Sequence, residues 1–169
     1  TQSGTEPGML GMVFHPDYPS DNRLYVDYNW TDSERKVWER LSSFAVTADS
    51  LENERILIDS IPGFRIHNGS RLVIGMDEKI YMTTGDYGQP NTALDTSSLN
   101  GKLLRINLDG TVPQDNPISG SYVYTIGHRN AQGLYQADNG ILYSTEHGPD
   151  NSDEINIMYP LRNYGWPIV

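Results

Sequence analysis

Three short polar segments contain most of the side chains in this sequence that could do chemistry. Each combines histidine, arginine or acidic residues with glycine and asparagine: FRIHNGSR (64–71), GHRNAQG (127–133) and EHGPDNSDE (146–154). Glycine and asparagine favour turns, so we expect all three segments to be loops between strands. Loops held by a rigid scaffold are the usual place for binding and catalytic residues. These segments are therefore the first candidates for a functional site.

His67 is the candidate general base. It precedes Asn68 and Gly69, shortly before a predicted strand that begins near Arg71. A loop imidazole can accept a proton at neutral pH, as a general base must. The alternative is a surface or turn histidine that only hydrogen-bonds the backbone.

Arg129 and Asn130 form the second candidate. A guanidinium fork and an amide could together hold a planar ligand that carries carboxylates or quinone oxygens. The alternative is an arginine that ties two parts of the fold together. His128 is the weaker candidate, because neighbouring side chains of an extended strand point in opposite directions, and a packed structural role is expected.

The third segment offers oxygen ligands. Asp150, Asp153 and Glu154 supply carboxylates, and Gly148 and Pro149 supply backbone carbonyls, which are the hard ligands that Ca²⁺ prefers. The spacing is not that of an EF-hand, so a solvated acidic turn is the alternative. Zinc is disfavoured, since the sequence has no cysteine and its 4 histidines show no paired ligand spacing.

Composition restricts the class of protein. The 169 residues include 12 Lys+Arg and 22 Asp+Glu, a net charge of −10, which disfavours nucleic acid as a partner. A hydrophobic fraction of 37% is enough for a globular core. No apolar run approaches the ~20 residues of a membrane-spanning helix, so none is predicted.

The scaffold is predicted to be almost all β. Short β-branched and aromatic runs are separated by turn residues, with one polar stretch, 31–39, that could form a helical turn. The predicted strands are 23–30, 41–46, 55–58, 72–74, 80–84, 102–107, 122–126, 141–145 and 154–158.

Three segments repeat one outline of strand, Asp-containing turn and strand with a tyrosine. The tyrosines are Tyr25, Tyr81 and Tyr143, which are 56 and 62 residues apart, a spacing that suits four-stranded propeller blades. Three blades cannot close a ring. We therefore expect residues 1–169 to be a partial propeller, either part of a longer chain or completed by a second copy, and the natural amino terminus to lie upstream of Thr1.

Eight motifs in order resemble one family. They are GMLGMVFHPD (8–17), HNGSRL (67–72), YMTTGD (81–86), LNGKLLRI (99–106), GHRNAQGL (127–134), EHGP (146–149), DEIN (153–156) and NYGWP (163–167). Together they resemble the glucose/sorbosone dehydrogenases, soluble aldose sugar dehydrogenases that use pyrroloquinoline quinone (PQQ). The resemblance spans nearly the whole chain and implies a six-bladed β-propeller, of which this chain would supply about three blades.

The resemblance also implies roles for individual residues. His67 matches the base that takes the proton of the sugar's C1 hydroxyl while a hydride passes from C1 to the quinone. The other matches are Arg129 and Asn130 as cofactor contacts, the carbonyls of Gly148 and Pro149 as ligands of the calcium that clamps the quinone, and Glu154 and Tyr164 as ligands of an additional calcium.

Two positions depart from the family pattern. Glu6 stands where the family often has a cofactor-contacting Gln, and Ile66 replaces the Asp that precedes the catalytic histidine in the glucose-specific branch. Ile66 therefore favours a broad aldose range. Basic residues that the family contributes from later blades would lie beyond Val169, so we expect this chain alone to bind the quinone poorly.

The implied function is oxidation of aldoses to lactones, with electrons passing to a soluble acceptor. Family resemblance also implies a periplasmic or secreted protein, and a homo-oligomer could complete the ring. Two other functions stay open: a non-catalytic propeller that acts as a binding or scaffold module, and a calcium-dependent lactonase-like propeller. The latter explains the acidic segment but not Arg129 and Asn130.

Overall fold

The computed structural model describes residues 6–168, which are built almost entirely from β-strands. The strands are β1 (Met9–Phe14), β2 (Arg23–Thr31), β3 (Val37–Val46), β4 (Leu51–Pro62), β5 (Gly69–Ile74), β6 (Lys79–Thr84), β7 (Lys102–Asn107), β8 (Val123–Ile126), β9 (Ala131–Gln136), β10 (Leu142–Glu146) and β11 (Glu154–Met158). A 3-10 turn, η1 (Pro90–Ala93), is the one helical element within residues 6–168. The predicted all-β class is confirmed.

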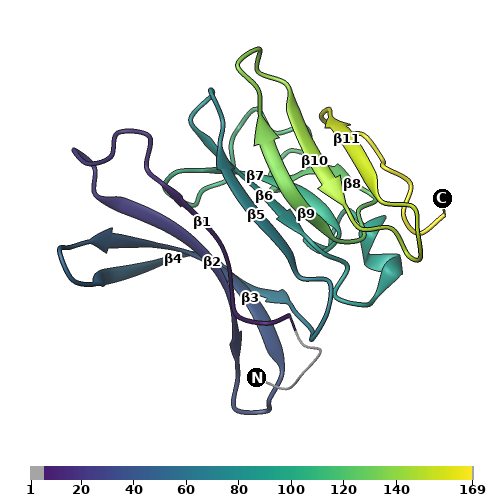
Figure 1. Cartoon of the computed structure of the whole chain (residues 1–169), viewed down its shortest axis with the longest axis horizontal. Coiled ribbons are helices and arrows are strands. Elements are labelled where there is room, and N and C mark those ends of the chain that lie inside the picture. Colours follow the sequence, from purple (N-terminus) through teal and green to yellow (C-terminus); the bar gives the residue numbers. More distant parts are fainter. Residues whose placement is uncertain (1–5, 169) are drawn as a thin grey trace.

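The strands form three antiparallel sheets that follow one another along the chain and lie side by side (Figure 1). The strand orders are β1-β2-β3-β4, β5-β6-β7-β8 and β11-β10-β9. β1 packs against β5, and β5 packs against β9, so the first strands of successive sheets lie together. Radially repeated sheets of this kind are propeller blades. The chain therefore forms three consecutive blades, the third with three strands among the described residues.

The repeated tyrosines occupy equivalent places. Tyr25, Tyr81 and Tyr143 lie on β2, β6 and β10, the second strand of each blade. Alternation along β6 and β7 then divides the core in two. Ile80, Met82 and Leu104 pack toward the first blade with Tyr25, whereas Tyr81 and Leu103 pack toward the third blade with Leu142 and Met158. Because successive side chains point to opposite faces, the middle blade supports both neighbours.

The helical turn predicted over 31–39 is wrong. This segment is the β2–β3 hairpin, and β3 already begins at Val37. Asp32 Oδ1 accepts hydrogen bonds from the backbone N–H groups of Glu34 and Lys36, both at 2.9 Å. Aspartate caps a hairpin turn with the same side-chain geometry that caps a helix, so the local signal does not separate the two.

Antiparallel pairing brings every second connection to one end of the blades. The β2–β3, β4–β5, β6–β7, β8–β9 and β10–β11 connections share this end, which is the lower side of Figure 1. The three polar segments singled out in the sequence lie at these connections. Their central residues form loops, whereas residues 69–71, 131–133, 146 and 154 belong to the adjoining strands. No helix in residues 6–168 has the length and apolar character needed to cross a membrane.

Candidate functional site

His67 is held by its backbone in the β4–β5 loop. Its φ of 57° lies in the left-handed region, its N–H donates to Glu6 Oε2 at 2.6 Å, and its carbonyl accepts the N–H of Tyr87 at 3.0 Å. Glycine is required at position 85, because a Cβ there would lie 1.9 Å from the carbonyl oxygen of His67. The imidazole itself is 16% exposed. The loop therefore presents one face of the ring while fixing its backbone.

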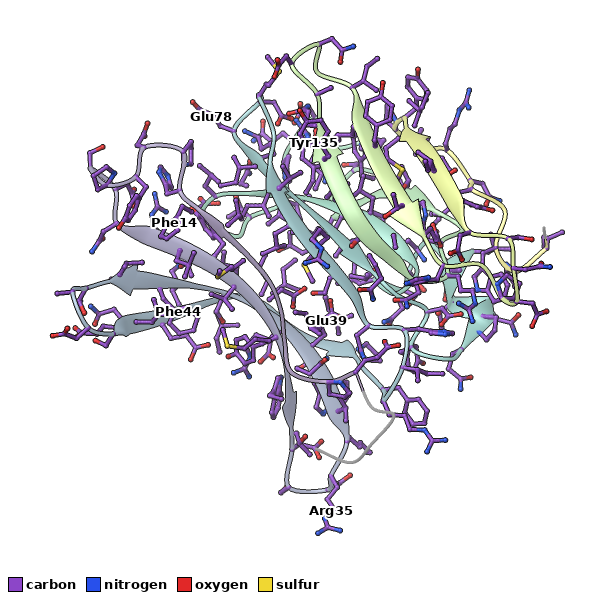
Figure 2. The ribbon with its side chains drawn as sticks, in the orientation of Figure 1. Phe14, Arg35, Glu39, Phe44, Glu78 and Tyr135 are labelled. Atoms are coloured by element: carbon purple, nitrogen blue, oxygen red, sulfur yellow. The ribbon has the colours of Figure 1, made fainter. Side chains whose placement is uncertain are left out.

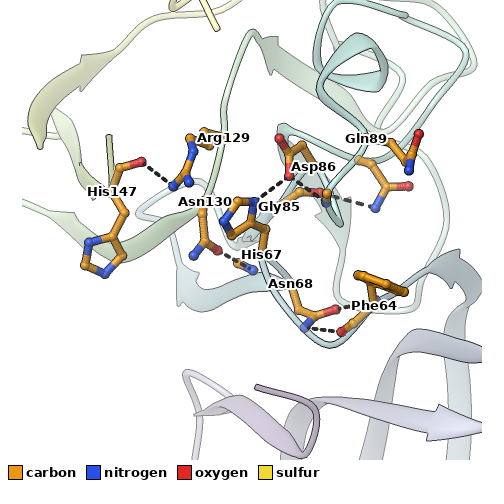
Figure 3. Close-up of polar contacts among 12 residues, drawn as sticks. Phe64, His67, Asn68, Gly85, Asp86, Gln89, Arg129, Asn130 and His147 are labelled. Atoms are coloured by element: carbon orange, nitrogen blue, oxygen red, sulfur yellow. Dashed lines mark hydrogen bonds and ion pairs between the residues drawn. The ribbon is translucent and has the colours of Figure 1, made fainter. Parts of the chain in front are cut away.

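Asp86 sets the orientation of the imidazole. Nδ1 of His67 lies 2.8 Å from Asp86 Oδ1 (Figure 3). The other carboxylate oxygen accepts a hydrogen bond from Trp166 Nε1 at 2.9 Å. Asp86 is fully buried. A carboxylate can only accept here, so Nδ1 carries the hydrogen and Nε2 keeps its lone pair for a proton. This is the geometry of an oriented general base.

Asp86 and Trp166 were not among the predicted site residues. Both lie in motifs that carry the family resemblance, but they are 19 and 99 residues from His67, and no spacing in the sequence connects them. The signal that could have found Asp86 is its place at the end of β6, directly after Gly85, because a polar residue that ends a strand often enters a site.

Arg129 and Asn130 have different surroundings. The Arg129 guanidinium donates to the carbonyl of His147 at 3.2 Å and lies 5.5 Å from the ring centre of Trp166. Asn130 is buried, and its Oδ1 accepts from the N–H of Gly69 at 3.0 Å. Asn130 thus ties the second blade to the third, the structural role considered for the arginine. Arg129 instead faces a cleft.

Glu146 anchors the backbone of this pair. Its Oε1 accepts hydrogen bonds from the N–H groups of Arg129 and Asn130. Its Oε2 lies 2.8 Å from His128 Nδ1, and that ring stacks on Tyr164 with centroids 4.8 Å apart. The packed role expected for His128 agrees with its 1% exposure. Sequence reasoning missed the role of Glu146, which the order of residues alone does not show.

One cleft brings together most of the predicted ligand residues. It has a volume of about 100 Å³ and is lined by Gly127, Arg129, Glu146, His147, Gly148, Pro149, Ser152, Glu154, Tyr164 and Trp166. Glu6 does not line it and contacts the backbone of His67 instead. Arg129 and the four residues predicted to bind calcium therefore line one cleft. Trp166, which also lines it, connects this cleft to the His67 and Asp86 pair through its hydrogen bond to Asp86.

The acidic side chains of the β10–β11 loop do not converge. Asp153 Oδ1 accepts the N–H of Gly148 at 3.1 Å, and Glu154 Oε2 accepts from Asn156 Nδ2 at 3.0 Å. The hydroxyl of Tyr164 donates to the carbonyl of Ile157 at 2.6 Å. Within residues 6–168, no three acidic or histidine side chains are grouped to hold a metal. A calcium ion here would depend on backbone carbonyls and on groups outside this part of the chain.

The donor set of the cleft suits a carboxylated planar quinone held with calcium. The Arg129 guanidinium can donate two hydrogen bonds to carboxylate or quinone oxygens, and the Trp166 ring lies beside it. Gly148 and Pro149 bring main-chain oxygens, which Ca²⁺ accepts as ligands, to the same cleft. Among the described residues Arg129 is the one arginine or lysine that lines it.

Comparison with known proteins identifies the family of this chain. The family model described as Glucose / Sorbosone dehydrogenase matches residues 2–169. The chain belongs to the glucose/sorbosone dehydrogenase family. The family assignment predicted from the eight motifs is thereby confirmed. Two relatives that are at least 30% identical to the chain are named as sugar dehydrogenases, which supports an oxidoreductase family.

Individual relatives show how much of the family fold is present. The chain is 40% identical over 191 residues to quinoprotein glucose dehydrogenase B of Acinetobacter calcoaceticus, covering 96% of this chain and 40% of that protein. It is 31% identical over 171 residues to aldose sugar dehydrogenase YliI of Escherichia coli K12, and this match covers 95% of this chain and 46% of that protein. The PQQ-bound aldose sugar dehydrogenase of Streptomyces coelicolor matches with a TM-score of 0.89 and 35% identity, covering 99% and 51%. The chain spans about half the length of these glucose/sorbosone dehydrogenase relatives, or less.

Proposed function

We propose that this chain provides the catalytic base and part of the cofactor site of a PQQ- and calcium-dependent aldose dehydrogenase. The observation that carries the proposal is the pairing of a partly exposed imidazole, His67, with the fully buried carboxylate of Asp86, 2.8 Å away. The reaction oxidises the C1 hydroxyl of an aldose to the lactone. Membership of a family of sugar dehydrogenases supports this choice of substrate class.

The chemistry of the chain's own residues follows from that pair. His67 Nε2 takes the proton of the C1 hydroxyl, and Asp86 stabilises the imidazolium that forms. Trp166 fixes the carboxylate of Asp86 from its other side. PQQ, when bound, supplies the acceptor for the hydride that leaves C1. Arg129 favours negative charge beside it, because a fixed cation stabilises charge that develops in the transition state.

Arg129, Asn130 and Glu6 remain our assignments for cofactor binding, and Gly148 and Pro149 for the calcium that holds the quinone. Glu154 and Tyr164 are assigned to a second calcium. Arg129, Gly148, Pro149, Glu154 and Tyr164 are supported by their shared cleft. Glu6 and Asn130 also hold the backbone around the base: Glu6 accepts the N–H of His67, and Asn130 accepts the N–H of Gly69 at the start of β5.

The proposed enzyme needs more than these three blades. Residues 1–169 would form part of one propeller domain, closed by further blades or by a second copy. We also propose, from the family, export to the periplasm or medium and a soluble electron acceptor. A scaffold module has no evident use for a buried carboxylate that orients a partly exposed imidazole, and a lactonase has none for Arg129 beside Trp166.

Titration with PQQ and Ca²⁺ tests the proposal. The complete propeller is expected to bind PQQ in the presence of calcium, and the quinone absorption should change when an aldose is added. The 169-residue chain, which spans about half the length of its relatives or less, is expected to bind at least ~10-fold more weakly, about 1.4 kcal/mol. Failure of the complete propeller to bind PQQ would favour the scaffold function. Calcium-dependent lactone hydrolysis without PQQ binding would favour the lactonase.

Substitution of Glu154 by glutamine should reduce stabilisation by calcium. A site occupied at ~100-fold above its dissociation constant stabilises the folded state by ~2.7 kcal/mol, because only the folded state offers it. We expect Ca²⁺ to raise the melting temperature of the wild type more than that of Glu154→Gln. Glu52→Gln, on the exposed part of β4, is the control. Equal melting shifts in the wild type and Glu154→Gln would remove Glu154 from the calcium site.

A further inference from the structure

A second cleft lies at the same end of the blades as the proposed active site. It has a volume of about 400 Å³ and is formed by the β2–β3 hairpin, the β4–β5 loop and the β6–β7 loop. Its lining residues are Arg35, Lys36, Val37, Trp38, Pro62, Gly63, Phe64, Arg65 and Tyr87. None of them lines the Arg129 cleft. The aromatic cleft, as we name this set, is therefore a separate site.

The three rings of the aromatic cleft belong to Trp38 on β3, Phe64 in the β4–β5 loop and Tyr87 in the β6–β7 loop. Trp38 Nε1 donates to Asp32 Oδ2 at 2.8 Å. Asn68 grips the backbone of Phe64 twice, accepting its N–H at 3.0 Å and donating to its carbonyl at 2.8 Å. The N–H of Tyr87 donates to the carbonyl of His67 at 3.0 Å. Hydrogen bonds thus hold the Trp38 ring and the backbones of Phe64 and Tyr87, so the frame of the cleft is largely preformed.

The charge of the aromatic cleft opposes that of the chain. The chain carries a net charge of −10, yet three basic residues and no acidic residue line this cleft. Lys36 is paired with Glu34 at 2.8 Å, whereas Arg35 and Arg65 form no ion pair among the described residues. Arg35 projects from the tip of the hairpin (Figure 2), and the Arg65 guanidinium lies 5.5 Å from the Phe64 ring centre. The guanidinium groups of Arg35 and Arg65 are therefore available to pair with an anionic ligand.

The aromatic cleft borders the catalytic loop. Phe64 and His67 belong to one loop, and Figure 3 shows Phe64 on the side of His67 away from Arg129. Tyr87 directly follows Asp86 in the chain. A ligand in this cleft would lie against the loops that hold the His67 and Asp86 pair, without occupying the place of either.

We propose that the aromatic cleft binds a planar aromatic anion. Stacking on aromatic rings and pairing with two guanidiniums favour that class over a neutral sugar or a cation. This inference rests on the proposed function for its role, that of the electron acceptor. Each aldose oxidised to a lactone releases two electrons and two protons. One quinone-type anionic acceptor takes up both pairs and becomes the corresponding hydroquinone-type product.

Binding of two planar dyes to the protein alone tests this site without PQQ, calcium or aldose. The anionic probe is 2,6-dichlorophenolindophenol and the cationic probe is methylene blue, both titrated calorimetrically at 0.15 M salt. We expect the anion to bind at least ~10-fold more tightly, ~1.4 kcal/mol. The overall negative charge would produce the opposite preference at a non-specific surface.

Two arginine variants locate the binding. Arg65→Gln should weaken binding of the anionic dye by ~10-fold. Arg162→Gln is the matched control, because Arg162 also covers an aromatic ring, that of Tyr159 at 5.1 Å, but lines no part of the cleft. Its effect should stay under about twofold. Circular dichroism checks that both variants are folded, and Arg35→Gln gives a second test of the cleft if Arg65→Gln is not.

Three results would overturn the inference: preference for the cationic dye, equal effects of Arg65→Gln and Arg162→Gln, or binding of a neutral disaccharide that Arg65→Gln weakens, with no binding of the anionic dye. The last would assign the aromatic cleft to a second sugar ring. Because no cofactor is present in this experiment, these results differ from failure of the proposed dehydrogenase, which the PQQ titration detects separately.

Discussion

Replacement of His67 by alanine in the complete, cofactor-loaded propeller is expected to lower aldose turnover by about 10² or more. The imidazole contributes the base, and its side chain is not among those that line the Arg129 cleft. Binding of PQQ should therefore stay within about twofold of the wild type. The measurement is the rate of quinone reduction in a single turnover, together with a PQQ titration of each protein. Unchanged turnover would remove His67 from the mechanism.

Asp86→Asn tests whether the hydrogen bond from His67 Nδ1 to Asp86 orients the imidazole. An asparagine can donate to Nδ1 as well as accept from it, so the imidazole is no longer held with Nε2 free to take a proton. We expect a loss of about 10² in kcat with a smaller change in KM, and a displaced pH profile of kcat. Asp95→Asn is the control, since Asp95 lies in the same β6–β7 loop and its carboxylate accepts hydrogen bonds only from Ser97 within residues 6–168. Equal kcat values for Asp86→Asn and the control would show that Asp86 does not position the base.

The second large effect concerns two acidic residues inside the fold. Asp27 on β2 and Glu39 on β3 are both fully buried, and Ser70 on β5 donates to Asp27 Oδ2. Within the described residues, Asp27 Oδ1 and both carboxyl oxygens of Glu39 have no hydrogen-bond donor. Figure 2 shows Glu39 at the seam between the first and second blades. A proton shared by the two carboxyls supplies the missing donor.

Burial makes this pair retain protons. Desolvation raises the pKa of Asp27 from 3.8 to about 7, and desolvation together with the charge of Asp27 raises the pKa of Glu39 well above its ordinary value. The charged group that each carboxyl faces is the other one, with Ser70 and the backbone N–H of Tyr28 as polar neighbours. Between about pH 4 and 7, Asp27 and Glu39 therefore bind more protons in the folded state than in the unfolded state.

The sign of the pH dependence follows. A carboxyl whose pKa is raised by folding stabilises the folded state fully below its unfolded pKa, and this stabilisation is lost as the pH rises through the folded pKa. Between about pH 4 and 7, the free energy of unfolding falls by ~1.4 kcal/mol for each unit of rising pH and for each extra proton that the folded state binds. We expect the protein to become less stable across this range because of Asp27 and Glu39.

Glu39→Gln isolates the contribution of the pair. The amide of glutamine donates to Asp27 without taking up a proton. The free energy of unfolding should therefore fall less steeply with rising pH than in the wild type, by the slope that corresponds to about one bound proton. Urea unfolding at pH 5, 6, 7 and 8 measures it, with Glu78→Gln in an exposed turn as the control. We expect the free energy of unfolding of Glu39→Gln, relative to that of the wild type, to rise by ~1 kcal/mol or more between pH 5 and pH 8. Parallel curves for the wild type and Glu39→Gln would contradict a shared proton.

Much of the fold could be predicted from residue order, because the evidence for it is local. The tyrosines at 25, 81 and 143, with their turns, mark the second strand of each blade correctly. Strand signals at 23–30 and 102–107 also match β2 and β7 closely. Alternation and turn chemistry act over a few residues and repeat with the blade, so they are visible without the structure. The hairpin at 31–39 was mistaken for a helical turn because Asp32 caps either structure.

The candidate site was predictable only where the residue type itself carries the chemistry. His67 and Arg129 stand out as a base and a cation in loops, whereas Asp86 and Glu146 act through partners that lie 19 and 17 residues away. Trp166 reaches Asp86 across 80 residues. The burial that makes Asp27 and Glu39 retain a proton depends on the meeting of two blades. Sequence by itself determined which groups are available and how often the blade repeats. Only tertiary packing decided which groups meet and which lose water, because hydrogen-bond geometry and desolvation depend on distance in space and not on distance along the chain.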